Sequence, residues 1–77
     1  MTIINTPPNG EFNSVAIDHQ NLEGIERELE QGVGTSCGDC FESDAEHLEV
    51  AFGKRYKFSF LPKTSAQGVL YIEPISN

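Results

Sequence analysis

The segment from Gly32 to Cys40 constrains the fold most, because it separates two halves of the chain that differ in charge and in pattern. It holds both cysteines and three of the seven glycines. Residues 1–50 contain eleven of the twelve acids and a single base, whereas residues 51–77 contain one acid and four bases. Such a charge asymmetry is typical of a chain with a dedicated interaction surface. We expect the segment to be an exposed loop at the edge of that surface.

The length of 77 residues predicts one compact domain spanning 1–77, in which residues 1–10 form either a short edge strand or a loose arm. A chain this short buries only about 60% of the surface of its unfolded form. Its apolar content of 38% is sufficient for a single core layer. We therefore expect one sheet packed against one helix, without a second domain.

Residues 22–31 have the pattern of a short amphipathic helix. Leu22, Ile25 and Leu29 lie three and four residues apart, and Gly32 follows at the position where helices commonly end. Acidic residues fill much of the remaining surface, and their mutual repulsion lowers the stability of the helix. A helix that keeps such carboxylates at this cost is a candidate binding element.

Residues 44–52 fit two structures. Ser43 and Glu46 match a capping box, which predicts a helix that starts there. The apolar residues of 48–52 also alternate, and a three-residue turn would pair them with the alternating aromatic residues of 56–60. That pairing also brings opposite charges together on the outer face. We favour the hairpin and keep the helix as the alternative.

Further strands are expected at residues 11–17, 56–61 and 68–73. Pro62 and Pro74 end the last two of them, because proline has no N–H group to donate to a sheet. The element order predicts an α+β domain, with a small antiparallel sheet of three to four strands and one short helix packed on one face.

The two cysteines have the spacing of a redox dithiol or of half a zinc site. A redox thiol is activated at the N-terminus of a helix, whereas this pair follows a helix and two glycines, and Asp39 between them disfavours a thiolate. A zinc site needs four ligands, and the candidates are Cys37, Cys40, His47 and His19. No second Cys-x-x-Cys motif and no closely spaced histidine pair completes this set. We expect no cofactor and favour no metal, and a zinc-binding or redox module is the first alternative function.

Catalysis has little support in this sequence. It contains no phosphate-binding loop, no Gly-x-Ser-x-Gly motif and no paired cysteine and histidine that would form a nucleophile, so we do not expect an enzyme. Residues 54–60 interleave basic and aromatic side chains, a pattern found on sheets that stack nucleic-acid bases. Their alternation assigns the rings to the core, and the net charge of −7 opposes binding to phosphates. Direct nucleic-acid binding is therefore not expected.

The acidic residues on either side of the glycine and cysteine segment carry the clearest functional signal. The partner-binding residues that we expect are Glu23, Glu26, Glu30, Asp39, Glu42 and Asp44. Such a surface imitates the phosphates of a nucleic acid and docks on a basic, nucleic-acid-binding surface of a larger protein. Small acidic proteins of this kind resemble, in general style, phage-encoded inhibitors of host defence or transcription machinery. The leading hypothesis is a non-enzymatic inhibitor that acts as a nucleic-acid mimic.

The remaining expectations concern assembly and location. The chain shows no leader-like segment and no apolar run that would cross a membrane, so we expect a cytoplasmic protein, in the host cytosol if it is phage-encoded. We expect a monomer or a weak dimer without membrane contact. The second alternative function is a structural subunit that adds an edge strand, residues 2–4 or 69–73, to a larger assembly.

Overall fold

The computed structural model describes residues 1–15 and 22–75, apart from the side chains of Leu22 and Lys54. The described elements are β1 (Thr2–Ile3), β2 (Phe12–Ser14), α1 (Leu22–Glu30), β3 (Gly34–Phe41), α2 (Glu42–Phe52), the 3-10 turn η1 (Gly53–Arg55), β4 (Tyr56–Pro62) and β5 (Gln67–Pro74). The α+β class is confirmed. The finer prediction is not, because the described residues form five strands and two helices rather than three to four strands and one helix.

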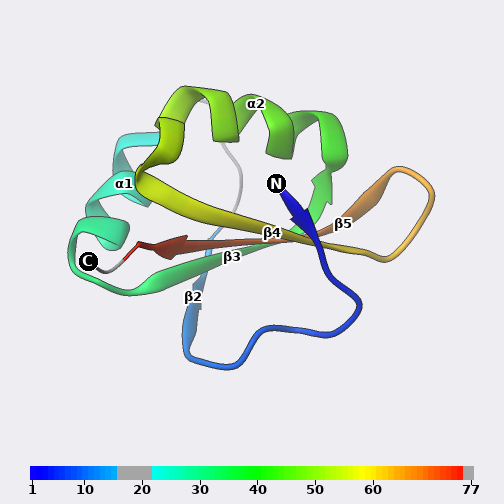
Figure 1. Ribbon diagram of the computed structural model, residues 1–77, viewed down its shortest axis with the longest axis horizontal. Coiled ribbons are helices and arrows are strands. Elements are labelled where there is room, and N and C mark those ends of the chain that lie inside the picture. Colours follow the sequence, from blue (N-terminus) through cyan, green and yellow to red (C-terminus); the bar gives the residue numbers. More distant parts are fainter. Residues whose placement is uncertain (16–21, 76–77) are drawn as a thin grey trace.

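The five strands form one mixed sheet in the order β1-β4-β5-β3-β2 (Figure 1). Strand β5 is antiparallel to both β3 and β4, while β1 is parallel to β4 and β2 is parallel to β3. The expected purely antiparallel sheet is therefore wrong. The physical reason is that α1 and α2 each connect two strands that run in the same direction, which a hairpin turn cannot do.

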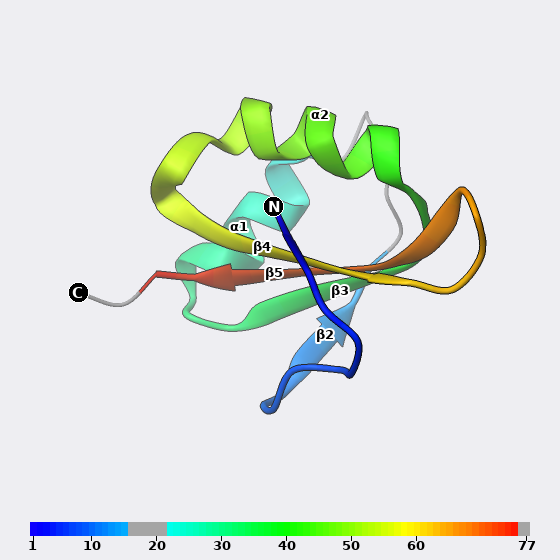
Figure 2. The same cartoon turned by 45° about the vertical axis from the view of Figure 1, so that its right-hand side comes forward.

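Both helices lie on the same face of the sheet (Figure 2). The α1 crossover leads from β2 to β3, and the α2 crossover leads from β3 over β5 to β4, so both move across the sheet in the same direction. Two right-handed crossovers that move in one direction place their helices on one face. No helix among the described residues is long and apolar enough to cross a membrane.

The predicted helix at residues 22–31 is confirmed as α1. Ile25 and Leu29 are buried, in agreement with the apolar stripe. Gly32 has a positive φ of 85°, and its N–H donates to the Leu29 carbonyl at 3.0 Å. This left-handed residue after the last turn is a common helix ending, and glycine adopts it without steric cost.

Residues 44–52 are helical, so the favoured hairpin is wrong. Ala45, Leu48 and Phe52 are buried at helical spacing, whereas Val50 is 82% exposed. A strand would have buried Val50 together with Leu48. The capping box is not formed either, because the helix begins at Glu42 and its cap residue makes no side-chain hydrogen bond. Tertiary packing of the apolar stripe therefore decides between two locally plausible structures.

The glycine and cysteine segment is not an exposed loop, because most of it forms strand β3 near the middle of the sheet. Cys37 and Cys40 would point to opposite faces of a regular strand. A shift in the pairing between them and β5, with Asp39 at a φ of 53°, forms an irregularity that lets both be buried. Asp is one of the few residues that tolerate this left-handed conformation.

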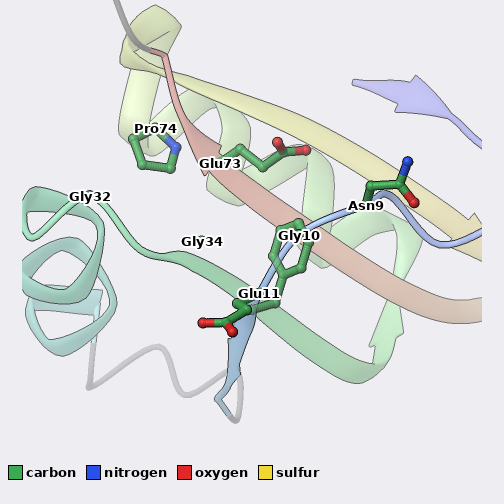
Figure 3. Close-up of a pocket in the computed structure, with 8 residues that line it drawn as sticks. Asn9, Gly10, Glu11, Gly32, Gly34, Glu73 and Pro74 are labelled. Carbon is green, nitrogen blue, oxygen red and sulfur yellow. The ribbon is translucent and has the colours of Figure 1, made fainter.

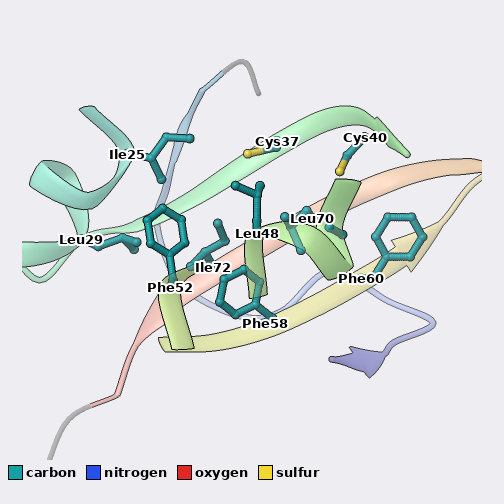
Figure 4. Packing of buried hydrophobic residues seen from close by; sticks show 11 residues of the cluster. Ile25, Leu29, Cys37, Cys40, Leu48, Phe52, Phe58, Phe60, Leu70 and Ile72 are labelled. Atoms are coloured by element: carbon teal, nitrogen blue, oxygen red, sulfur yellow. The ribbon is translucent and has the colours of Figure 1, made fainter. Parts of the chain in front are cut away.

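The core lies between the helices and the sheet (Figure 4). Its buried side chains are Ile25, Leu29, Cys37, Cys40, Ala45, Leu48, Phe52, Phe58, Phe60, Leu70 and Ile72. On β4 and β5, Phe58 pairs with Ile72 and Phe60 pairs with Leu70, so alternate residues of both strands enter this core. Every strand from β3 to β5 and both helices thus contribute to one continuous cluster.

Residues 4–11, which we call the N-terminal strap, cross the opposite face of the sheet from β1 to β2 (Figures 1 and 2). At its end, the Phe12 ring packs on Tyr71 at 5.1 Å between ring centroids. A Cβ atom at Gly34 would lie 2.7 Å from this ring, so the glycine allows the close approach. Thr2–Ile3 pair with β4 at the edge of the sheet, and the strap runs beside Lys57, Ser59 and Glu73.

Candidate functional site

The helix-covered side carries most of the acidic residues of the chain. We call α1 and α2 with their carboxylates the acidic helix layer. Its acids are Glu23, Glu26, Glu28, Glu30, Glu42, Asp44, Glu46 and Glu49. The same two helices contain a single base, Arg27. Because both helices pack on one face of the sheet, these carboxylates belong to one side of the molecule.

The six predicted partner-binding residues form two groups rather than one cluster. Glu23, Glu26 and Glu30 lie on α1, which ends just before β3 begins. The other three, Asp39, Glu42 and Asp44, lie where β3 ends and α2 begins. An eight-residue strand is about 25 Å long, so Glu30 and the second group lie near opposite ends of β3. Five of the six predicted residues therefore belong to the acidic helix layer, and Asp39 lies on β3 just before it.

Glu26 and Glu49 of this layer each take part in an ion pair within the described residues. The Arg55 guanidinium donates to Glu26 Oε1 at 2.7 Å, which ties α1 to the turn that follows α2. This contact raises the pKa of Arg55. The amino group of Met1 lies 2.6 Å from Glu49 Oε2. These pairs reduce the negative charge that Glu26 and Glu49 offer to a partner.

The helix dipole explains some of the remaining acids but not all. Glu23 lies in the first turn of α1, and Glu42 and Asp44 lie in the first turn of α2. Carboxylates stabilise a helix at that end, where the dipole is positive. Glu28 and Glu30 occupy the last turn of α1, where the dipole is negative and a carboxylate destabilises the helix. The helix itself gives no reason for the exposed Glu30, so Glu30 is the clearest candidate for a functional role, whereas Glu28 is half-buried and its Oε2 is buried without a hydrogen-bond partner among the described residues.

The cysteine pair lies inside the core (Figure 4). Burial raises the pKa of Cys37 to about 12, and burial together with the nearby Asp44 carboxylate raises the pKa of Cys40 to about 11. Cys40 does precede the N-terminus of α2, contrary to the sequence-based placement, and a backbone hydrogen bond at Ala45 acts to lower its pKa. Desolvation and Asp44 outweigh that effect. Both thiols are therefore protonated at neutral pH, whereas the thiolate is the nucleophile and metal ligand.

The candidate zinc ligands are only partly described. His19 lies outside the described residues, and His47 is exposed on α2, whereas both cysteines are buried on β3. Within residues 1–15 and 22–75, no group of three or more His, Cys, Asp or Glu side chains is arranged to hold a metal ion.

A cavity of about 330 Å³ lies on the strap side of the sheet (Figure 3). Glu11, Glu73 and Asn9 are the polar side chains that line it, beside Phe12. The carboxylates of Glu11 and Glu73 point away from each other (Figure 3). They do not converge on a common point, as an acid and base pair or a cation site would require.

Sequence reasoning missed an apolar depression at the end of α2. It is lined by Glu49, Val50, Gly53, Tyr56 and Ile75, and we call it the Val50 depression. The hairpin prediction had assigned Val50 to the core, so its exposure was not foreseen. The helical spacing of the three buried residues of α2 was the signal that would have placed it outside.

Comparison with protein-family models, with curated proteins and with solved structures finds no match for this chain.

Proposed function

We propose that this chain is a non-enzymatic interaction protein whose acidic helix layer docks on a basic surface of a larger protein. The carrying observation is that eight carboxylates and one base lie on two helices that share one face of the sheet. Opposite charge speeds the association of such surfaces and makes it dependent on salt. Basic surfaces are common on proteins that bind nucleic acids, so the partner class that we favour is a nucleic-acid-handling protein.

The cost of the acidic residues to the protein supports this proposal. Glu26 and Glu30 lie one turn apart on α1, and like charges at this spacing destabilise a helix. Glu28 and Glu30 also oppose the helix dipole. Carboxylates that carry these penalties support a surface that is kept for a partner. On that partner the carboxylates would imitate nucleic-acid phosphates, and the chain would act as an inhibitor.

The experiment is affinity capture with the full chain, followed by measurement of the dissociation constant of the captured complex over a range of salt. The test variant is Glu23→Lys with Glu30→Lys, two exposed positions of α1. The matched control is Glu11→Lys with Glu73→Lys, which changes the net charge equally on the strap side. We expect the test variant to weaken binding at least about tenfold and the control to weaken it by less than about threefold.

Two results would contradict the proposal. Equal weakening by the two double variants would show that only net charge matters. Affinity that does not change with salt would show that the carboxylates do not make the contact.

A further inference from the structure

An apolar contact accompanies the charged one, and this inference rests on the proposed function. We propose that the partner anchors itself with one apolar side chain, flanked by basic residues, that enters the Val50 depression. The occupant is thus a basic segment with a central aliphatic or aromatic residue, and the acidic helix layer supplies the surrounding charge.

The exposure of the lining residues is the first support. Val50 is 82% exposed and Ile75 is 49% exposed. Single exposed apolar residues are normal on a protein surface, but these two line the same depression together with Tyr56. Val50 is also β-branched, so an exposed helix position gains nothing from it in helix propensity or in burial. Contact with a partner would bury this surface.

The depression is also held in shape before any partner arrives. The Tyr56 ring packs edge-on against Phe52, with centroids 5.8 Å apart, and the Arg55 guanidinium lies 5.5 Å from the Tyr56 centroid. Arg55 is in turn held by Glu26 at 2.7 Å. The wall that Tyr56 forms is therefore fixed from two sides, which lowers the entropy lost when a side chain enters.

The charges around the depression select the partner. Glu49 lines it but is paired with the Met1 amino group, so the charge beside the depression comes mainly from the exposed Glu46, one helical turn before Val50, and from the acids at the start of α2. The positive charge of Arg55 is balanced by Glu26. The surroundings on α2 are thus acidic and favour a basic segment. They disfavour a second copy of this chain, because two acidic helix layers would repel each other across the contact.

The test uses two synthetic peptides in which arginine alternates with glycine, one with a central phenylalanine and one with alanine in its place. Their dissociation constants for the full-length chain are measured at low salt. We expect the phenylalanine peptide to bind about tenfold more tightly than the alanine peptide. In the variant Val50→Asn this ratio should fall below about twofold, while the affinity for the alanine peptide stays unchanged. The control Ala51→Asn, an exposed neighbour that does not line the depression, should keep the ratio.

Three other outcomes would overturn the inference, and each identifies a different premise as wrong. If both peptides bind with strong salt dependence but equally well, the apolar anchor is wrong and the proposed function stands. If neither peptide binds at low salt, the acidic docking surface fails and the anchor fails with it. If sedimentation shows a dimer that Val50→Asn abolishes, the occupant is a second copy of the chain.

Discussion

Eleven buried side chains form one cluster between the sheet and the helices α1 and α2, whereas the opposite face of the sheet is crossed by the strap of residues 4–11. On β5 the residues that face the helices are buried, while Val69, Tyr71 and Glu73 on the strap side are only half-buried. The helix side therefore combines most of the packing with most of the charge. On this side of the molecule, the inner surface of the helices stabilises the fold, and their outer surface is available to a partner.

The largest expected difference between the faces concerns equivalent truncations of leucine. Leu48 on α2 is fully buried, so Leu48→Ala should lower the free energy of unfolding by about 2–5 kcal/mol. Leu61 lies half-buried on the strap side of β4, and Leu61→Ala should cost only about 1 kcal/mol. Denaturant unfolding of both variants measures the pair. Equal losses would contradict the view that the packing energy is concentrated under the helices.

A smaller contrast comes from two glycines of the sheet. A Cβ at Gly68, on the helix side of β5, would meet the Leu61 carbonyl oxygen, and this backbone atom cannot move without separating β4 from β5. Gly68→Ala should therefore cost about 3 kcal/mol or more. At Gly34, on the strap side, the obstacle is the Phe12 ring, which can turn away, so Gly34→Ala should cost about 1 kcal/mol. Thermal melts should rank the two variants in this order.

The Gly34 effect has its own control. In the background Phe12→Ala the ring is gone, so adding Gly34→Ala should cost less than it does in the native chain. An unchanged cost would mean that the obstacle is the Ile72 carbonyl oxygen, which lies 3.3 Å from the same Cβ position.

The buried thiols predict a pH dependence that belongs to the helix side. Their pKa values in the folded chain, about 12 for Cys37 and about 11 for Cys40, lie above the ordinary value of 9.0. The unfolded chain therefore loses these protons first, and the free energy of unfolding should fall as pH rises from about 9 to about 11. Below pH 9 both states keep the protons, and the thiols contribute no slope. Urea unfolding measures this dependence in the native chain and in the double variant Cys37→Ala with Cys40→Ala. The free energy of unfolding should fall less steeply with pH in the double variant. An identical slope in the two proteins would contradict the burial of the thiols.

The smallest expected effect concerns the ion pair between Glu26 and Arg55 at the edge of the acidic helix layer. Exposed pairs of this kind contribute little to stability and are screened by salt. Glu26→Gln should leave the melting temperature nearly unchanged at physiological salt. It should nevertheless loosen the Tyr56 ring, which NMR line shapes of that ring would detect, while Glu23→Gln on the same helix should not. A Tyr56 ring unaffected by Glu26→Gln would remove the pair from the account of the Val50 depression.

The sequence predicted the elements whose signals are local. The α1 helix follows from its apolar spacing and from Gly32, and β5 follows from its alternation and Pro74. Strand β3 was missed because glycines are unfavourable in strands, and only its place between β5 and β2 explains how it forms. In residues 44–52 the helical and strand patterns overlap, so packing on the sheet had to decide between them.

The candidate site was predictable in kind but not in layout. The acids of α1 and of the β3–α2 junction could be named from composition, but their distribution along the helix layer depends on the two crossovers. The Val50 depression could not be found, because it joins α2 to residue 75, which lies beyond two further strands. Contacts between such distant positions leave no pattern in a single sequence.

The most direct test of the central claim is a two-dimensional amide NMR titration of the full chain with the arginine and phenylalanine peptide. The account predicts chemical-shift changes in α1, α2 and η1, largest around Val50 and lost at high salt, with residues 4–11 and Tyr71 unaffected. Changes that cluster instead at the strap and the Phe12 cavity, or that persist at high salt, would contradict the assignment of the acidic helix layer as the interaction surface.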